Sequence, residues 1–225
     1  MPVIEFGLMG VKPNHPVTSP STPSGQILQS AWSQLSTAPN GPAWVYGGVE
    51  VSDPEKLWGF FEFESVEQHE QFARTFGGEA VKDLPKILTH SEFQKHITVQ
   101  PGFGDVLSAS ETEILLVYFP ADISDEQKNK ATEALTGIIE ESGLKEDAHV
   151  KAVKWGWSVE NDFPVLGEKD RAGRVFAIFL GRESADVERG LQKGQEGVGY
   201  VGEFAGLDGV VTIVRRVVAC IKFGE

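Results

Sequence analysis

Two stretches of the sequence decide the fold: LWGFFEFESVEQHEQF (Leu57–Phe72) and RVFAIFLGRESADVERGL (Arg174–Leu191). Each stretch begins with an apolar run, continues through Glu-Ser and ends in an acidic segment with helical spacing. Ser65 in the first stretch is a good helix N-cap, and Gln68 completes a capping box with it. The chain therefore carries the same strand-to-helix corner twice, about half its length apart.

The first half of the chain predicts the order strand, helix, strand, strand, helix, strand. Apolar residues spaced for one helix face predict the first helix, and Pro54 ends the second strand. A further short helical piece is expected before the last strand. The predicted strands are 3–12, 43–54, 56–65 and 92–100, and the predicted helical segments are 26–38, 65–76 and 78–90.

The second half repeats this order after a linker at 101–110. Ser124 and Gln127 form a second capping-box pattern, and Gly190 and Gly194 weaken the last predicted helix. The glycine-rich segment Gly197–Gly209 reads as a flexible loop, with a lid as one option. The predicted strands are 113–120, 149–160, 174–184 and 209–223, the helices are 124–143 and 184–196, and a loop is expected at 161–173.

Both corners thus fit one structural unit, the ferredoxin-like β-α-β-β-α-β motif. Its antiparallel sheet carries helices on one face, and an apolar second face left in water costs about 25 cal/mol per Å². A second copy of the sheet can cover it. We therefore predict an α+β fold of two tandem ferredoxin-like units, 1–103 and 104–225, which close into an intramolecular α/β barrel of the dimeric type.

The bulk composition excludes several classes of partner. The formal net charge of -13 repels phosphate backbones and anionic lipid, so we expect neither nucleic-acid nor membrane binding. The single cysteine, Cys220, excludes an internal disulfide framework, and the N-terminus lacks a signal-peptide pattern. We expect a cytoplasmic protein, and homodimerisation stays open because such barrels leave strand edges exposed.

FFEFESVEQHEQF, WGWSVEND and RVFAIFLGRESADV together resemble the dimeric α/β-barrel superfamily. The nearest resemblance is to antibiotic-biosynthesis-monooxygenase-type and stress-responsive barrel proteins, especially the tandem two-unit versions of fungi. The resemblance implies cofactor-free oxygenation, polyketide cyclisation, decarboxylation, haem degradation, or a protein without known activity. In the second copy, Glu188 stands at the position that matches His69, counted from Ser184 and Ser65.

Histidines are the candidate catalytic residues. The oxygenation and cyclisation chemistries implied by the resemblance begin by removing an acidic proton, and histidine shuttles protons near neutral pH. His90 and His96 flank the start of the strand at 92–100, and His69 lies on the helix behind the sheet. We expect these three side chains to converge on a cavity in the first unit, although His69 and His90 also fit solvated surface positions.

No motif of the sequence signals a metal or a nucleotide cofactor. It contains no HxH, HxxxH or CxxC, no GxGxxG that opens a helix after a strand, and no GxSxG nucleophile elbow. Nothing marks a histidine as a haem ligand. We therefore expect no metal and no cofactor.

Aromatic residues crowd the second and third strands of each copy. Most of them must pack the core, but beside histidines they could also line a pocket for a flat, apolar ligand. Tyr46 and Trp58 are candidates to orient the substrate or to donate a hydrogen bond to an enolate oxygen. The candidate substrate-binding residues are Tyr46, Trp58, Trp44, Trp155 and Trp157.

Two functions from different classes follow from these residues. The first is a cofactor-independent enzyme of secondary metabolism that removes a proton from an apolar, enolisable aromatic or polyketide-like substrate, with His96 and either His90 or His69 as the base. The alternative is a non-catalytic, stress-associated or ligand-binding barrel in which the aromatic residues are only core.

Overall fold

The computed structural model describes residues 2–142, 144, 147, 149–183 and 199–224. It is a mixed α+β structure with a large antiparallel sheet. The chain divides into two compact units, Met1–Val99 with Val217–Glu225, and Gln100–Arg216. The predicted domains 1–103 and 104–225 stay a prediction, and the C-terminal residues from Val217 group with the first unit.

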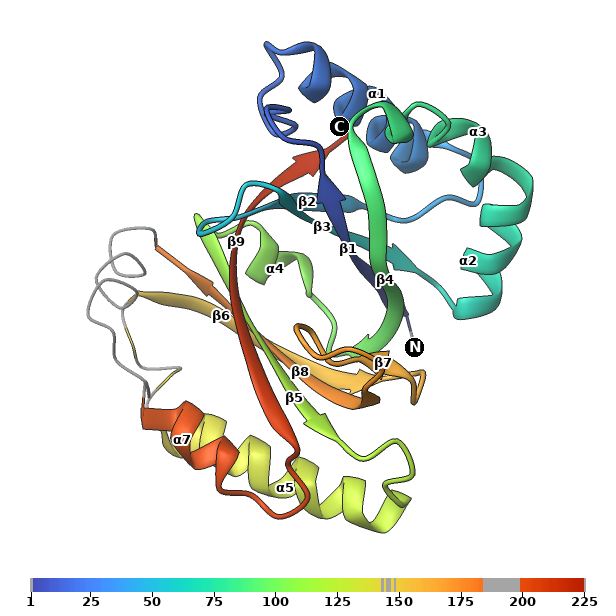
Figure 1. Cartoon of the computed structure of the whole chain (residues 1–225). Coiled ribbons are helices and arrows are strands. Elements are labelled where there is room, and N and C mark those ends of the chain that lie inside the picture. Colours follow the sequence, from blue (N-terminus) through green and yellow to red (C-terminus); the bar gives the residue numbers. More distant parts are fainter. Residues whose placement is uncertain (1, 143, 145–146, 148, 184–198, 225) are drawn as a thin grey trace. The chain divides into compact units, whose positions relative to one another are not determined.

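The first unit has the predicted order of elements (Figure 1). Its elements are β1 (Val3–Val11), α1 (Pro23–Thr37), β2 (Val45–Glu50), β3 (Lys56–Phe63), α2 (Val66–Phe72), a π-helical turn (Ala73–Gly77), α3 (Gly78–Ala80), a 3₁₀ turn (Leu84–Lys86) and β4 (Leu88–Val99). The strands pair antiparallel in the order β4-β1-β3-β2, and the C-terminal part of β9 (Thr212–Phe223) pairs with β2.

The helices of the first unit cover one face of its sheet. Trp32, Leu35 and Phe72 come from α1 and α2 and pack in one core cluster with Val45 and Phe61 of the strands. α1 begins at Pro23, earlier than predicted, because the Thr22 hydroxyl accepts a hydrogen bond from the Gly25 N–H at 3.1 Å and proline suits the first helical turn.

The opposite face of this sheet carries a stack of aromatic rings. The ring centroids of Phe6, Trp58 and Phe60 lie 6.3 Å from one another with nearly parallel planes, and Phe93 meets Phe6 edge-on at 5.5 Å. Phe6, Trp58 and Phe60 are fully buried. This alternation of faces along β1 and β3 is the period-2 pattern expected of strands.

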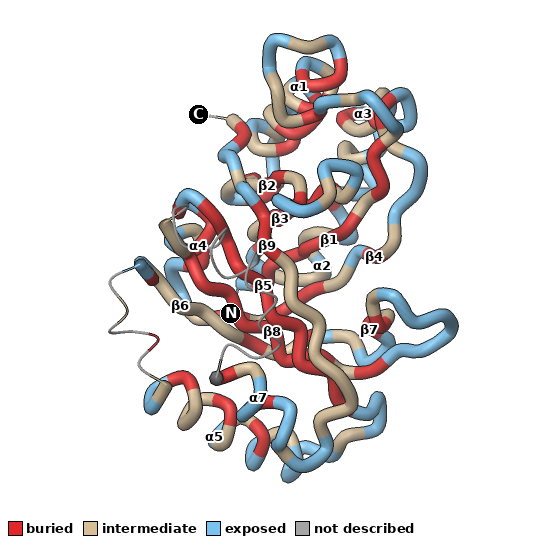
Figure 2. Tube along the Cα trace, turned by 60° about the vertical axis from the view of Figure 1, so that its left-hand side comes forward, coloured by how far each residue is buried: buried red, intermediate tan, exposed pale blue. Residues whose placement is uncertain are grey.

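The second unit contains α4 (Gly104–Leu107), β5 (Glu111–Phe119), α5 (Asp125–Glu141), β6 (Val150–Ser158), β7 (Phe163–Pro164), β8 (Ala172–Arg182), α7 (Gly199–Ala205) and the start of β9. β8 pairs antiparallel with β5, β6 and β7. Every residue of β5 is buried (Figure 2). The capping box of Ser124 and Gln127 is confirmed, since each side chain bonds the backbone N–H of the other.

Three local predictions need correction in the second unit. The linker at 101–110 contains helix α4, and the loop at 161–173 contains the short strand β7. The glycine-rich segment Gly197–Gly209 contains helix α7, because Tyr200 and Phe204 lie one helical turn apart and both are buried in the core cluster of this unit. The predicted helix at 184–196 and Glu188 lie outside the described residues.

Candidate active site

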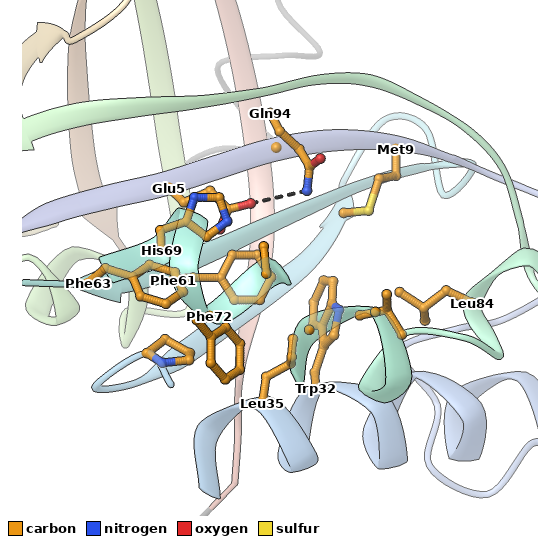
Figure 3. A pocket seen from close by; sticks show the side chains of 16 residues that line it. Glu5, Met9, Trp32, Leu35, Phe61, Phe63, His69, Phe72, Leu84 and Gln94 are labelled. Carbon is orange, nitrogen blue, oxygen red and sulfur yellow. Dashed lines mark hydrogen bonds and ion pairs between the residues drawn. The ribbon is translucent and has the colours of Figure 1, made fainter. Parts of the chain in front are cut away.

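A cavity of about 240 Å³ lies between the sheet and the helices of the first unit (Figure 3). Its walls are mostly apolar and aromatic, and its polar side chains are those of three residues. The lining residues that the structure describes are Glu5, Gly7, Met9, Trp32, Leu35, Pro42, Phe61, Phe63, His69, Phe72, Ala73, Gly77, Gly78, Val81, Leu84 and Gln94.

Trp32 forms one wall because the sheet has no side chain beneath its indole ring. A Cβ atom at Gly47 of β2 would overlap that ring. The indole meets the ring of Phe61 edge-on, with centroids 5.5 Å apart, and that of Phe223 at 4.8 Å. These contacts hold Trp32 in one orientation, so the wall is preformed.

Three side chains from β1, β4 and α2 meet at one end of the cavity. Oε2 of Glu5 lies 3.0 Å from Nε2 of His69, and Oε1 of Glu5 accepts a hydrogen bond from Nε2 of Gln94 at 3.1 Å (Figure 3). Glu5 is 4% exposed and the His69 side chain 19%. A carboxylate this deeply buried depends on such hydrogen bonds.

His96 extends this group behind His69. Nε2 of His96 lies 2.8 Å from Nδ1 of His69, and His96 stands directly opposite Glu5 in the β1–β4 register. An ionised carboxylate only accepts hydrogen bonds, so Nε2 of His69 carries the hydrogen that faces Glu5. Nδ1 of a neutral His69 then accepts from Nε2 of His96. We call Glu5, His69, His96 and Gln94 the polar cluster.

The sequence named two of these four residues, His69 and His96, and the structure brings both together. His90, the third predicted base, does not join them. Its side chain is 56% exposed, and its nearest described partners are the Thr89 hydroxyl at 2.8 Å and Glu92 at 3.8 Å. The catalytic roles of the three histidines stay predictions.

The five aromatic residues predicted to bind substrate are not among the described residues that line this cavity. Trp58 lies on the opposite face of the sheet, where its Nε1 donates to Glu50 at 3.0 Å. The rings of Trp44 and Tyr46 pack edge-on against each other at 5.5 Å.

Trp155 and Trp157 belong to the second unit, where they pack against its core cluster. Nε1 of Trp157 donates to the Thr132 hydroxyl of α5 at 2.8 Å, and the Lys128 ammonium lies 5.3 Å from the ring centroid of Trp157. These contacts place both rings in packing roles within their unit, and a role in substrate binding stays a prediction.

Sequence reasoning missed Glu5 and Gln94. Both lie in strands that the sequence predicted, although β4 begins at Leu88, within the segment that was predicted as helical. Nothing in the sequence says which face of β1 the helices cover. The available signal was the position of Glu5 in the apolar run VIEF, where a charged side chain must be exposed or partnered. Val3 and Gly7 share the helix-covered face of β1 with Glu5, and Glu5 and Gly7 both line the cavity.

The second unit has a buried glutamate at the matching place. Glu113 is the third residue of β5, as Glu5 is of β1, and it is fully buried. Its oxygens accept from Nε of Arg182 at 2.7 Å and from Nε of Arg215 at 2.6 Å, and the Tyr200 hydroxyl lies 3.1 Å away. Arginine stays protonated in proteins, so this group is an ion-pair network and not a proton relay.

Among the residues that the structure describes, no group of three or more His, Cys, Asp or Glu side chains is arranged to hold a metal ion. No described helix is long and apolar enough to cross a membrane.

No protein-family profile matches the sequence, and no curated protein matches it. Solved structures match the fold along nearly the whole chain. A "putative monooxygenase" from Lactobacillus acidophilus has a TM-score of 0.59 at 11% identity, covering 99% of this chain and 96% of that one. An anthrone oxidase-like protein has a TM-score of 0.56 at 14% identity, covering 100% and 94%.

A "putative chlorite dismutase" has a TM-score of 0.55 at 7% identity, covering 98% of this chain and 94% of that one. Identities this low show a shared fold and nothing about shared chemistry.

Proposed function

We propose that the chain is a small-molecule enzyme that removes a proton from an apolar, enolisable aromatic or polyketide-like substrate held in the cavity of the first unit. One observation carries this proposal: the apolar cavity ends at a buried carboxylate that is coupled through His69 to His96. The names of the structural neighbours, with monooxygenases and an anthrone oxidase-like protein among them, support a small-molecule enzyme at a coarse level.

Glu5 is the proton acceptor in this proposal, and His69 is its partner. The substrate C–H or O–H bond breaks, its proton moves to the Glu5 carboxylate, and the electron pair stays on the substrate as an enolate or phenolate. The hydrogen bond from His69 orients the carboxylate, and His96 fixes the tautomer of His69. His96 is thus a positioning residue, while His90 has no part in the step.

Gln94 is suited to stabilise the oxygen on which charge develops. Its amide has two hydrogens, and one of them bonds Glu5. The second can donate to a substrate oxygen placed beside the carboxylate, as donors in an oxyanion hole do. Gln94 thus replaces Tyr46 and Trp58 in the role that the sequence suggested for them.

Hydrogen exchange into a model ketone tests the proton-removal step without any assumption about the later reaction. 2-Tetralone is an enolisable ketone fused to an aromatic ring, and its mass increases as its α-hydrogens exchange in D₂O. We expect the protein to accelerate this exchange. General-base catalysis contributes about 10²–10⁴-fold, so Glu5→Gln should lose most of the acceleration.

Two further variants define the cluster. His96→Gln should lower the exchange rate less than Glu5→Gln does and should shift its pH profile, because it changes the tautomer of His69 and not the acceptor. Glu70→Gln is the matched control: it removes the same charge from an exposed side chain of α2, beside His69 in sequence. Wild-type exchange in folded Glu5→Gln would refute the proposal.

A second candidate function is non-catalytic ligand binding. It is favoured by the fact that both ring nitrogens of His69 already have partners, at 3.0 and 2.8 Å. In that case the protein binds 2-tetralone without accelerating its exchange.

We also propose the finer arrangement expected from the sequence, in which two tandem ferredoxin-like units form an intramolecular barrel of a cytoplasmic, fungal-type, cofactor-independent protein. The strand order β4-β1-β3-β2 of the first unit and the near-complete coverage of the structural neighbours support this arrangement.

A further inference from the structure

The charge, shape and size of the cavity restrict the ligand more narrowly than the proposed function does. The charge is set by Glu5, whose carboxylate faces the cavity at 4% exposure. None of the described lining residues is Lys or Arg. An anionic ligand would therefore be desolvated beside a buried negative charge without a permanent cation to offset it. A neutral ligand that donates a hydrogen bond to Glu5 avoids this cost.

The shape of the cavity favours a flat ring. The indole of Trp32 and the phenyl rings of Phe61, Phe63 and Phe72 form its walls (Figure 3). Aromatic rings pack against one another edge-to-face or offset-stacked, as Trp32 and Phe61 already do with an interplanar angle of 84°. The polar groups lie at one end only, so a ligand needs its polar atoms on one edge.

The size of the cavity sets the number of rings. A protein cavity of about 150 Å³ lined by apolar side chains holds one benzene molecule. The present cavity of about 240 Å³ is roughly 1.6 times larger. Two fused rings suit this volume, whereas a third ring would extend beyond the walls of the cavity.

We propose that the cavity binds a neutral bicyclic hydroxyarene, or the enol of a bicyclic ketone, with its hydroxyl group donating to Glu5 and its rings between Trp32 and Phe72. This inference rests on the proposed function for the location of the site, and it adds the ring number, the charge and the orientation of the ligand.

Equilibrium binding of four compounds tests each part of the inference. 2-Naphthol is the probe, and its fluorescence reports binding. 2-Naphthoate has the same rings with a carboxylate, naphthalene has no polar group, and 2-hydroxyanthracene has a third ring. We expect 2-naphthol to bind at least about tenfold more tightly than naphthalene and 2-naphthoate, since a hydrogen bond to a charged group is worth about one decade or more in affinity. We expect it also to bind more tightly than 2-hydroxyanthracene, because the third ring of that compound does not fit between the cavity walls.

Glu5→Gln locates the site. This variant keeps the volume of the side chain and removes its charge, so 2-naphthol should bind about tenfold more weakly and 2-naphthoate should lose most of its disadvantage. Glu70→Gln, the same change on the exposed face of α2, should keep the wild-type order of the four compounds. Circular dichroism of each variant confirms that it is folded.

Each contrary result overturns a stated part of the inference. Equal binding of 2-naphthoate refutes the charge argument, and equal binding of 2-hydroxyanthracene refutes the ring number. An unchanged affinity for 2-naphthol in folded Glu5→Gln, or no binding to the wild type, refutes the ligand class at this site. Selective binding of 2-naphthol without exchange of 2-tetralone would leave this inference standing and refute the proposed enzyme. Exchange of 2-tetralone that depends on Glu5, without selective binding of 2-naphthol, would leave the proposed enzyme standing and refute this inference.

Discussion

Glu5 shows at the scale of one residue why a site can escape sequence reasoning. His69 and His96 could be named from proton chemistry alone, because few other side chains titrate near neutral pH. A glutamate in a strand usually faces solvent, and only the packing of α2 over β1 makes Glu5 a buried partner of His69. Residue type thus predicted the histidines, while the carboxylate needed the tertiary structure.

Trp58 offers a test of structural against ligand-binding roles. Trp58→Phe removes the Nε1 donor that reaches Glu50 at 3.0 Å in a buried environment. We expect the free energy of unfolding to fall by about 1–3 kcal/mol, the usual cost of such a loss. Exchange of 2-tetralone per folded molecule should stay unchanged. Urea unfolding and the exchange assay measure the two effects. Loss of exchange in a stable Trp58→Phe protein would show that Trp58 takes part in substrate binding.

Buried tyrosines of the second unit make stability depend on pH in the alkaline range. Burial raises the pKa of Tyr118 and of Tyr200 above the ordinary value of 10.0. Above that value, an unfolded tyrosine loses its proton while the folded one keeps it, so unfolding releases protons and stability falls as pH rises. The slope is at most about 1.4 kcal/mol per pH unit for each tyrosine.

Tyr118→Phe should reduce this slope, although it also removes the hydrogen bond from the hydroxyl to the Pro164 carbonyl at 2.9 Å. Urea unfolding at a series of pH values, from neutral to above the ordinary tyrosine pKa, measures the slope directly. Stability that rises over this range in the wild type would contradict the assignment.

At the scale of elements, sequence patterns were most reliable where a local signal stood alone. The capping residues Ser65 and Ser124 start α2 and α5 as predicted, since capping depends on neighbours in sequence. The α7 segment was predicted as a loop because its glycines lower helix propensity. It forms a helix because the burial of Tyr200 and Phe204 outweighs this low propensity. Helix caps could thus be predicted from neighbouring residues, whereas a helix that is stabilised by burial against the rest of the unit could not.

The segment that follows α2 contains two glycines in helical conformation beside the cavity. Gly77 and Gly78 join the π-helical turn to α3 with ordinary helical dihedrals, and a Cβ atom at Gly78 would meet nothing within 4 Å. Gly78→Ala should therefore stabilise the protein by about 0.5–1 kcal/mol, because alanine loses less backbone entropy on folding.

Gly25→Ala is the opposite case within the same unit. Its Cβ atom would overlap the carbonyl of Ser19, so the variant should be less stable than the wild type. Chemical denaturation of the two variants measures whether each substitution raises or lowers the free energy of unfolding. A destabilised Gly78→Ala protein would show that the glycine is needed for packing.

At the scale of the whole molecule, each unit has a buried glutamate in its first strand, with different partners. The carboxylate of Glu5 is paired with one histidine and an amide, whereas that of Glu113 is paired with two arginines and a tyrosine. The sequence predicted that the corner repeats, but it did not predict that the two units differ at this glutamate. Nor did it predict that the last strand adds its C-terminal residues to the first unit.

Glu113 should therefore matter for stability and not for proton transfer. Glu113→Gln leaves two partly buried guanidinium groups without their fully buried carboxylate, and breaking a buried ion pair costs about 3–5 kcal/mol. Exchange of 2-tetralone per folded molecule should be retained at a temperature where the variant is folded. A stable Glu113→Gln protein that cannot catalyse exchange would contradict the different roles of Glu5 and Glu113.

The most direct test of the central claim is a long-range ¹H–¹⁵N NMR spectrum of the histidine rings at neutral pH, recorded for the wild type and for Glu5→Gln. The geometry predicts that neutral His69 and His96 both carry their hydrogen on Nε2, each fixed in one tautomer, and that Glu5→Gln changes the resonances of both rings. Two rings that average between tautomers, and that do not respond to Glu5→Gln, would show that the polar cluster is not coupled and would contradict the account.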